Sequence, residues 1–257
     1  MQNNPSSRTA HSIMETALLA GKVMLENGAE TSRVEDTMER IIRHALGDCN
    51  PASAYTYVTI NGIVAKLDSM GTQFHRIDRR QYDLNKITKV NQLSRDLTAG
   101  RIGLEDMLIA LQAIDKENTS QKLWRRLICT ASLSGSIMLI FGGAFEDLPA
   151  AMIAGVVAYL SFLWLTQALA IPFLAECGAA FLGGWAGLCT ASVLGRHLEL
   201  IMMGAVVPLV PGIAITNAIR DMMARHYISG MIGAIEALLI AGALGGGIAG
   251  VYCMFIL

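Results

Sequence analysis

The stretch LPAAMIAGVVAYLSFLWLTQAL, from Leu148 to Leu169, contains no charged side chain in 22 consecutive residues. An α-helix rises 1.5 Å per residue, so about 20 apolar residues cross the ~30 Å hydrocarbon core of a bilayer. This stretch therefore predicts a transmembrane helix, and the rest of the chain can be organised around it.

Four more apolar stretches accompany it in the second half of the chain. The predicted spans are 127–145, 148–169, 171–194, 198–218 and 230–256. Residues 1–126 contain 17 Lys/Arg and 15 Asp/Glu, whereas residues 127–257 contain only 3 and 6. This asymmetry predicts an α-helical integral membrane protein with five transmembrane helices (127–257) and an N-terminal soluble domain (1–126).

The soluble half combines helical and extended patterns. Apolar residues recur at helical spacing in four segments: Ile13 to Met24, Val34 to Ala45, Leu84 to Leu97 and Leu104 to Ile114. Residues 54–60 and 63–67 are β-rich and flank an Asn61-Gly62 turn signal, and a third strand is expected near 73–77. The order α-α-β-β-β-α-α predicts a small α+β domain, with Thr31 or Ser32 capping its second helix.

Composition and missing motifs narrow the function. A net charge of −1 gives no field for nucleic acid, and the five cysteines include no C-x-x-C pair. The chain contains no G-x-S-x-G, no H-E-x-x-H and no phosphate-cradling glycine loop. We therefore expect no catalytic residue, no metal site and no cofactor, and we expect membrane lipids as partners.

Charged residues beside the spans predict the orientation. Basic residues that flank membrane spans prefer the cytoplasmic side. When the Lys and Arg residues at 122–126 and 220–225 are placed in the cytoplasm, Arg196 alone among the basic residues flanking the spans lies on the outer side. The N-terminal segment lacks the apolar core of a signal peptide. The prediction is a plasma-membrane protein (bacterial inner membrane) with a cytoplasmic N-terminus and an outer C-terminus.

The fourth span carries an unusual interruption. Pro208, Pro211 and Gly212 lie near its middle, where proline removes a backbone donor and crowds the preceding turn. Broken helices inside membranes line wet cavities or are covered by protein, and they recur at transporter substrate sites. The alternative is a proline kink with no ligand.

Two carboxylates lie inside predicted spans, Glu176 in the third and Glu236 in the fifth. A buried carboxylate must be paired, protonated or hydrated, and Asn217, Arg220 and Asp221 are expected at the same membrane face. We predict a cytoplasm-facing vestibule in which at least one glutamate carries a proton. The alternative is a purely structural or interfacial role.

A polar motif opens the second helix of the soluble domain. Glu30, Arg33 and Glu35 stand at spacings that permit local ion pairs, so a solvated helix start is one interpretation. His75 and Arg76 follow in the strand region, where a structural histidine is the alternative to a functional one.

Glycines recur every four residues in the last span, at Gly242, Gly246 and Gly250. Small residues let helix backbones approach closely in lipid. The spacing fits packing within the chain or docking of another subunit.

Several of these motifs resemble the threonine/serine exporter family. The resemblance is carried by Gly28-Ala29-Glu30-Thr31-Ser32-Arg33-Val34-Glu35, by the Asn61-Gly62 hairpin and His75-Arg76-Ile77, and by Val210-Pro211-Gly212 with Asn217-Ala218-Ile219-Arg220-Asp221. Family members occur as one long chain of about ten spans or as two chains, and this chain resembles the larger half of the split form.

The resemblance implies a subunit of a secondary exporter for small carboxylate-bearing metabolites, of the succinate or the threonine/serine class. Its partner would be a short membrane protein of four or five spans, or a second copy of itself, and its substrate a small anion or zwitterion. The alternative function is a membrane-anchored enzyme or ligand sensor that uses the soluble domain.

Overall fold

The computed structural model describes residues 5–47, 54–67, 71–77, 80–118, 121–169, 171, 173–194 and 196–255. It divides into two compact units. The first consists of Met1–Thr119 with Ile213–Ala234, and the second of Ser120–Gly212 with Ile235–Leu257. Helix α10 (Tyr227–Phe255) therefore contributes residues to both units.

The first unit holds the helices and strands of the N-terminal half. They are α1 (Pro5–Glu26), α2 (Thr31–Leu46), β1 (Ala54–Thr59), β2 (Gly62–Leu67), β3 (Gly71–Arg76), α3 (Leu84–Thr98) and α4 (Leu104–Lys116). The unit also includes α9 (Gly212–Met223) from Ile213 onward, although this segment lies far along the chain.

The three strands form an antiparallel sheet in the order β1-β2-β3. Its first hairpin differs by one residue from the expected Asn61-Gly62 turn. Thr59 pairs with Gly62, so Ile60 and Asn61 form the turn. Gly62 is part of the sheet, where it pairs with Thr59 and Arg76, and the Phe74 ring lies so close that a Cβ at Gly62 would be 2.7 Å from it.

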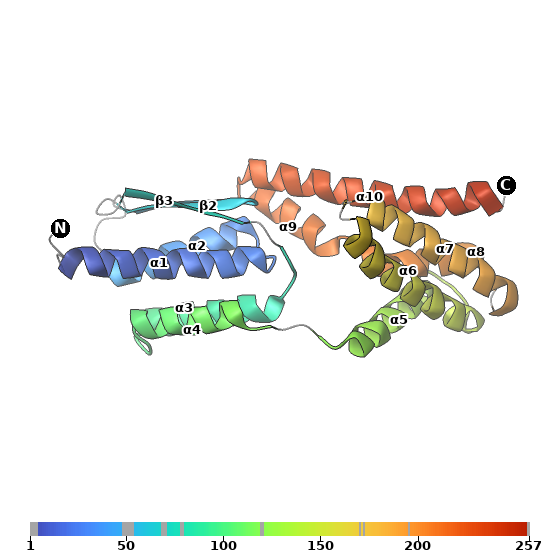
Figure 1. Cartoon of the computed structure of the whole chain (residues 1–257), viewed down its shortest axis with the longest axis horizontal. Helices are drawn as coiled ribbons and strands as arrows, with labels where there is room; N and C mark the ends of the chain where they lie inside the picture. The colour runs from blue at the N-terminus through green and yellow to red at the C-terminus, as the bar shows by residue number, and fades with distance from the viewer. Residues whose placement is uncertain are drawn as a thin grey trace. The chain divides into compact units, whose positions relative to one another are not determined.

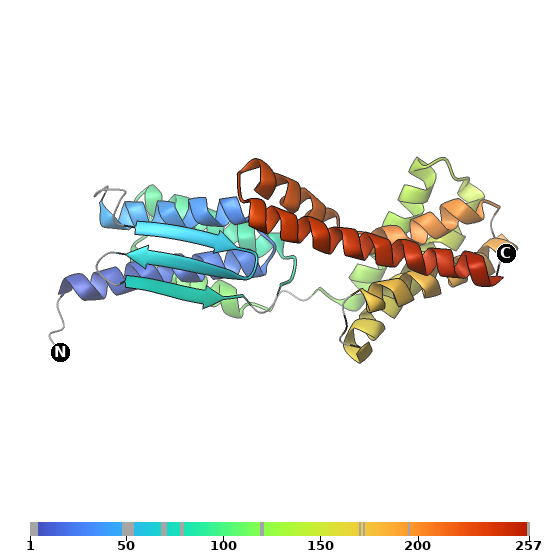
Figure 2. The same cartoon turned by 90° about the horizontal axis from the view of Figure 1, so that it is seen from above.

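The first unit is layered. Figures 1 and 2 show α1 and α2 against one face of the sheet, with α3 and α4 packed on the far side of these two helices. Ile13, Met38, Ile63 and Met107 lie fully buried between the layers. Burying each such side chain contributes about 1.5–3 kcal/mol of transfer free energy. This unit therefore has a hydrophobic core of its own.

Two glycines allow the close packing of α1 and α2. A Cβ at Gly21 would lie 2.5 Å from the sulfur of Met38, so the helices touch at this point. Gly28, in the turn between them, has φ of 89°. A Cβ added at Gly28 would lie only 2.5 Å from the Tyr82 ring. A residue with a side chain would be strained there by both conformation and contact.

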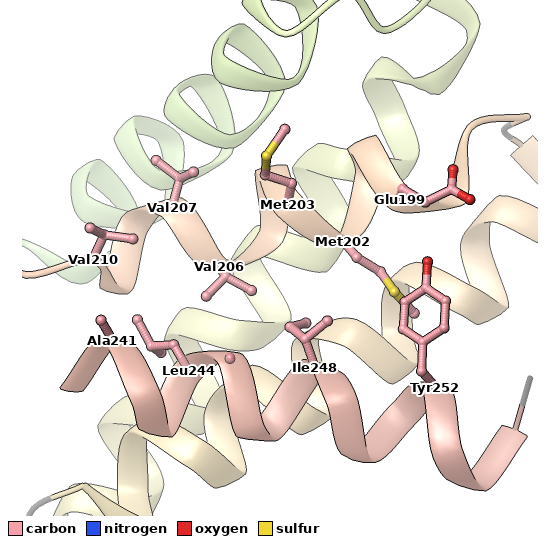
Figure 3. Close-up of a pocket in the computed structure, with 11 residues that line it drawn as sticks. Glu199, Met202, Met203, Val206, Val207, Val210, Ala241, Leu244, Ile248 and Tyr252 are labelled. Carbon is pink, nitrogen blue, oxygen red and sulfur yellow. The ribbon is translucent and has the colours of Figure 1, made fainter. Parts of the chain in front are cut away.

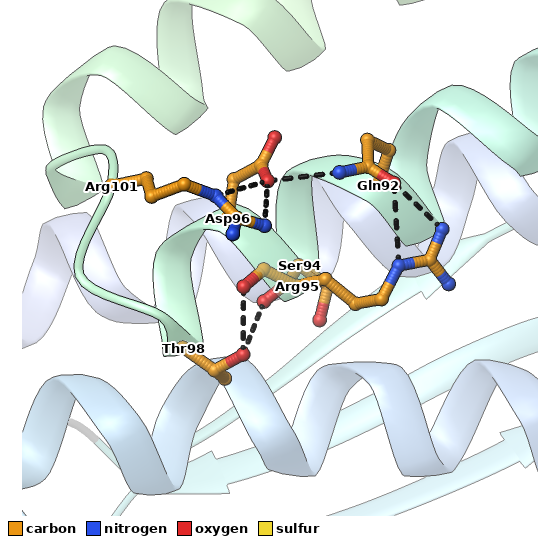
Figure 4. Close-up of polar contacts among 6 residues, drawn as sticks. All are labelled: Gln92, Ser94, Arg95, Asp96, Thr98 and Arg101. Carbon is orange, nitrogen blue, oxygen red and sulfur yellow. Dashed lines mark hydrogen bonds and ion pairs between the residues drawn. The ribbon is translucent and has the colours of Figure 1, made fainter.

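The C-terminal end of α3 is tied by side chains. Asp96 accepts hydrogen bonds from Gln92 and Arg101, and the Thr98 hydroxyl donates to the backbone carbonyls of Ser94 and Arg95 (Figure 4). The Thr98 hydroxyl thus shares carbonyls of the last turn of α3, and the Asp96–Arg101 contact ties the end of α3 to the segment that leads into α4.

The second unit holds the apolar helices. They are α5 (Leu123–Ile140), the 3-10 turn η2 (Phe145–Asp147), α6 (Leu148–Leu169), α7 (Leu174–Leu194), α8 (Leu198–Val206), the 3-10 turn η3 (Val207–Leu209) and α10 from Ile235. The chain is thus mostly helical, with one small sheet.

Among the described residues, two helical stretches are long and apolar enough to cross a membrane, Phe145–Leu169 and Tyr227–Phe255. A third candidate is the broken pair Leu198–Leu209 and Gly212–Met223, bent by 61°. α5 begins with Arg125 and Arg126, and α7 contains Glu176 and several glycines, so both are less apolar. The count of five spans therefore stays a prediction.

Small residues bring the helices of the second unit together. A Cβ at Gly155 would fall 1.9 Å from the Ser134 hydroxyl, and one at Gly247 would fall 2.3 Å from the Cys177 carbonyl oxygen. In contrast, a Cβ at Gly242 or Gly246 would meet nothing within 4 Å. Gly247 thus serves packing within the chain, whereas Gly242 and Gly246 lie on an uncovered strip of α10.

A buried carboxylate joins two connections of the second unit. Asp147, with none of its surface exposed, accepts hydrogen bonds from the backbone amides of Ala144, Arg196 and His197. Its Oδ2 also lies 2.8 Å from Nδ1 of His197. This network holds the α5–α6 and α7–α8 connections at the same end of the unit.

Candidate functional site

The interruption expected in the fourth span is present in the backbone. η3 ends at Leu209, Val210 is extended (φ −65°, ψ 129°), and α9 begins at Gly212 directly after Pro211. The Gly212 amide donates to the Val210 carbonyl oxygen at 2.8 Å. Because Pro211 has no amide hydrogen, the helical ladder cannot run through this point.

After this break, α9 contacts the start of α2 through Asp221. The Asp221 carboxylate, 3% exposed, accepts from the Thr31 amide at 3.0 Å and from the Thr31 hydroxyl at 2.8 Å. It also accepts from the Ser32 amide. Glu30 is the N-cap residue of α2 but makes no side-chain cap bond, so Asp221 takes the capping role from a distant helix.

This finding corrects the expectation that Thr31 or Ser32 caps the helix by itself. A carboxylate at a helix N-terminus satisfies amides that have no partner within the helix and opposes the positive end of its dipole. These two effects explain how a carboxylate can be buried at this position.

Two more residues of α9 contact the same turn. The Asn217 side-chain amide donates to the Gly28 carbonyl oxygen at 2.9 Å. Arg220 Nη1 lies 3.4 Å from Glu30 Oε2, and Arg33 Nε lies 3.3 Å from Glu30 Oε1. Asn217, Arg220 and Asp221 share one side of α9, and this side faces the α1–α2 turn.

The turn after α9 supplies a fourth contact. His226 Nε2 lies 3.3 Å from Glu35 Oε2, and both side chains are mostly buried. The other oxygen of Glu35 accepts from the Val58 amide of β1 at 2.8 Å. Burial raises the pKa of Glu35, and the Val58 bond and His226 act in the opposite direction.

We call this set of contacts the clasp. It comprises Gly28, Glu30, Thr31 and Glu35 on one side and Asn217, Arg220, Asp221 and His226 on the other. All eight residues belong to the first unit. The motif around Glu30 to Glu35 and the motif around Asn217 to Asp221, which are far apart in the sequence, thus form one cluster.

The remaining predicted site residues lie elsewhere. Pro208 lies in η3, and His75 and Arg76 end β3. Glu176 lies near the start of α7, and its Oε2 is buried without a hydrogen-bond partner among the described residues. Glu236 lies on α10, in the second unit like Glu176.

A groove of about 480 Å³ runs between α8–η3 and α10 within the second unit (Figure 3). Its wall is mainly apolar and includes Val206, Leu244 and Ile248, with Glu199 and Tyr252 at one end. Such a surface suits an apolar occupant and gives a small polar solute few hydrogen-bond partners. The described residues contain no group of three or more His, Cys, Asp or Glu arranged to hold a metal ion.

Sequence reasoning singled out most residues of the clasp but missed its connectivity and missed His226. The available signal was the spacing of Asn217 and Asp221, four residues apart and hence on one helix face. Their partners lie about 190 residues earlier, and a single sequence contains nothing that reports such a contact.

Comparison with protein families matches residues 15–254 to the ThrE family, described as "putative threonine/serine exporter". Comparison with curated proteins and with solved structures returned no match. The family match and the apolar helices together mark a membrane protein of a transport family. Because the match runs through both units and includes every residue of the clasp, the chain belongs to the ThrE family of threonine/serine exporters.

Proposed function

We propose that this chain is one subunit of a secondary exporter in the bacterial inner membrane, moving small carboxylate-bearing metabolites of the threonine/serine or succinate class. Family membership supports transport rather than catalysis. The observation that carries the proposal is the break at Val210 to Gly212, because an interrupted helix in an apolar segment is a recurrent feature of secondary-transporter substrate sites.

In the proposed arrangement the chain crosses the membrane five times, with its N-terminus in the cytoplasm and its C-terminus outside. The distribution of Lys and Arg supports this orientation. The contact between Asp147 and His197 is consistent with it, because both connections would then lie on the outer side.

The export route would pass the break. Pro208 and Pro211 have no amide hydrogen to donate to a helical ladder, and Gly212 carries no side chain, so carbonyl groups near the break can face a solute or water. Asn217, Arg220 and Asp221 follow directly and would form its cytoplasmic side together with Glu30 and Glu35 of the clasp and the neighbouring Arg33. His75 and Arg76 would lie in the same cytoplasmic domain.

Export would be driven by an ion or proton gradient or by the gradient of the substrate, because the sequence contains no nucleotide-binding motif. Glu176 and Glu236 are the candidate proton carriers. The observation behind this role is the Oε2 of Glu176, which is buried and has no hydrogen-bond partner among the described residues.

A partner would complete the transporter. Five spans are an awkward number for an inverted-repeat architecture, and a short membrane protein of four or five spans or a second copy of the chain would supply the missing half. The uncovered glycines Gly242 and Gly246 support a docking face on α10, because close backbone approach stabilises helix pairs in lipid.

Efflux from proteoliposomes tests the function. Vesicles loaded with labelled threonine, serine or succinate are prepared with this chain alone and with its short partner, under imposed pH gradients. We expect at least one solute to leave faster than from empty vesicles, and Glu176→Gln or Glu236→Gln to change its pH dependence. If no solute moves but the chain turns over a metabolite, an enzyme function replaces this proposal.

A further inference from the structure

α9 is attached to the α1–α2 turn by polar contacts, whereas its close packing is with the start of α10, where a Cβ at Gly230 would lie 2.4 Å from Met222. Of its 12 residues only Ala218 and Asp221 are buried. Ile219 is 50% exposed and Met223 is 80% exposed. By comparison, α2 buries six residues, four of them apolar, in the core of the same unit. The attachment of α9 to the α1–α2 turn therefore buries little apolar surface, and contacts of this kind open first.

Backbone breaks at both ends interrupt the helical path between α9 and the segments that precede and follow it in the chain. Val210 is extended before it, and Pro211 prevents a continuous helix. After it, Arg225 adopts a left-handed conformation (φ 70°), which is unfavourable for a residue with a side chain. Because no continuous helix runs through either end, α9 depends on its side-chain attachments to keep its orientation.

The clasp provides these attachments. Asp221 caps α2, Asn217 binds the Gly28 carbonyl, and Arg220 reaches Glu30. Each of these contacts can be replaced by water when α9 moves away, because every group in them is a hydrogen-bonding or charged group. An apolar contact of the same extent could not be exchanged in this way.

We propose that α9 is a releasable arm, and that its detachment from the α1–α2 turn is a required step of the export cycle. This inference rests on the proposed export function. Asp221 and Asn217 act in it as positioning residues that hold α9 against the α1–α2 turn. Because α9 directly follows the Val210–Gly212 break in the chain, they also fix the backbone at that break. Release frees the peptide units at the break to rotate.

A covalent lock tests the requirement for release. Thr31→Cys and Asp221→Cys are combined in a chain whose five native cysteines are replaced, because the two native side chains are in contact. The oxidised protein should lose at least 90% of its efflux rate, and reduction should restore it. Each single variant should respond to neither oxidant nor reductant.

Efflux in the oxidised double variant equal to that in the reduced form overturns the proposal, and so does failure of the disulfide to form. The reduced double variant lacks the Asp221 cap, and the disulfide would replace that attachment. A purely structural clasp therefore predicts a higher efflux rate in the oxidised form than in the reduced form. The direction of the change therefore separates a releasable arm from a brace.

Hydrogen exchange provides a readout that does not depend on transport. In the full chain in detergent, amides of α9 should exchange at least tenfold faster than those in the middle of α2, and the disulfide should remove this difference. If α9 is as protected as α2, the arm does not open and the inference is wrong. If α9 opens but the wild type moves no solute, the proposed function and the required step in export both fail, and only the opening of α9 stands.

Discussion

The carboxylate of Asp221 caps helix α2 by accepting hydrogen bonds from Thr31, a residue 190 positions earlier in the chain. The cap joins the start of α2 to the segment that follows the break at Val210 to Gly212. It also gives a physical reason why the Glu30 and Asp221 motifs belong together, since neither satisfies its polar groups without the other.

Replacing Asp221 should loosen the start of α2. Asp221→Ala leaves the Thr31 and Ser32 amides without an acceptor, and loss of a helix cap costs about 0.5–2 kcal/mol. Asp221→Asn keeps an acceptor oxygen and should cost less. Hydrogen exchange at the first turn of α2 should accelerate roughly tenfold in the alanine variant, since 1.4 kcal/mol corresponds to a factor of ten.

The exposed acid Glu105, in the first turn of α4, provides a control. Glu105→Ala should leave exchange at the α2 start unchanged. If Asp221→Ala also left it unchanged, the carboxylate would not be the cap.

Glu35 should make stability depend on pH. Burial raises the pKa of Glu35 above its ordinary 4.5, so the folded state holds this proton more tightly than the unfolded state. The stabilisation is complete below pH 4.5 and is lost as the pH rises through the raised pKa. Glu35→Gln keeps an acceptor for Val58 and removes the titration.

Thermal unfolding of the full chain in detergent, followed from pH 4 to pH 7, measures this difference. The wild type should lose stability relative to Glu35→Gln as the pH rises. Parallel curves for the two proteins would contradict the assigned direction.

Adjacent glycines on α10 give a matched pair for packing. Gly247→Ala places a methyl group against the backbone of α7, which cannot move aside, and overpacking of this kind costs about 1–3 kcal/mol. Gly246→Ala enters open space and should be neutral or slightly stabilising. Melting temperatures in detergent should fall only for Gly247→Ala; equal effects would mean that α10 and α7 are not in contact.

Thiol labelling tests the orientation. In a chain without native cysteines, Glu146→Cys should react with a membrane-impermeant maleimide in intact cells. Met223→Cys, at an exposed position next to the clasp, should react only after permeabilisation. The reverse pattern would place the N-terminus outside.

Local patterns predicted local structure well. The helical spacing of Ile13 to Met24 and the β-rich run at 54–60 lie in a helix and a strand of the structure, and the break at Pro211 lies where proline chemistry requires one. The hairpin turn is shifted by one residue from the expected Asn61-Gly62, because Gly62 pairs with both neighbouring strands and lies under the Phe74 ring, contacts that a local turn signal does not report.

Long-range relationships could not be predicted in the same way. Apolar composition grouped α9 with the membrane half, but the structure assigns it to the N-terminal unit, because its polar face contacts the α1–α2 turn. The expected partners of Arg220 were carboxylates at the same membrane face, whereas the structure pairs it with Glu30. Such pairings depend on tertiary geometry, which spacing along the sequence does not encode.

The most direct test asks whether the break borders water. Single cysteines are placed at Val210 and Ile213, which flank Pro211 and Gly212, and at Leu160 in the middle of α6 as a control. Labelling of each cysteine by a hydrophilic thiol reagent is then measured in proteoliposomes. The account predicts labelling at the first two positions, slowed by the exported solute, and none at Leu160. Absence of labelling at both Val210 and Ile213 would place the break against acyl chains and contradict the export route.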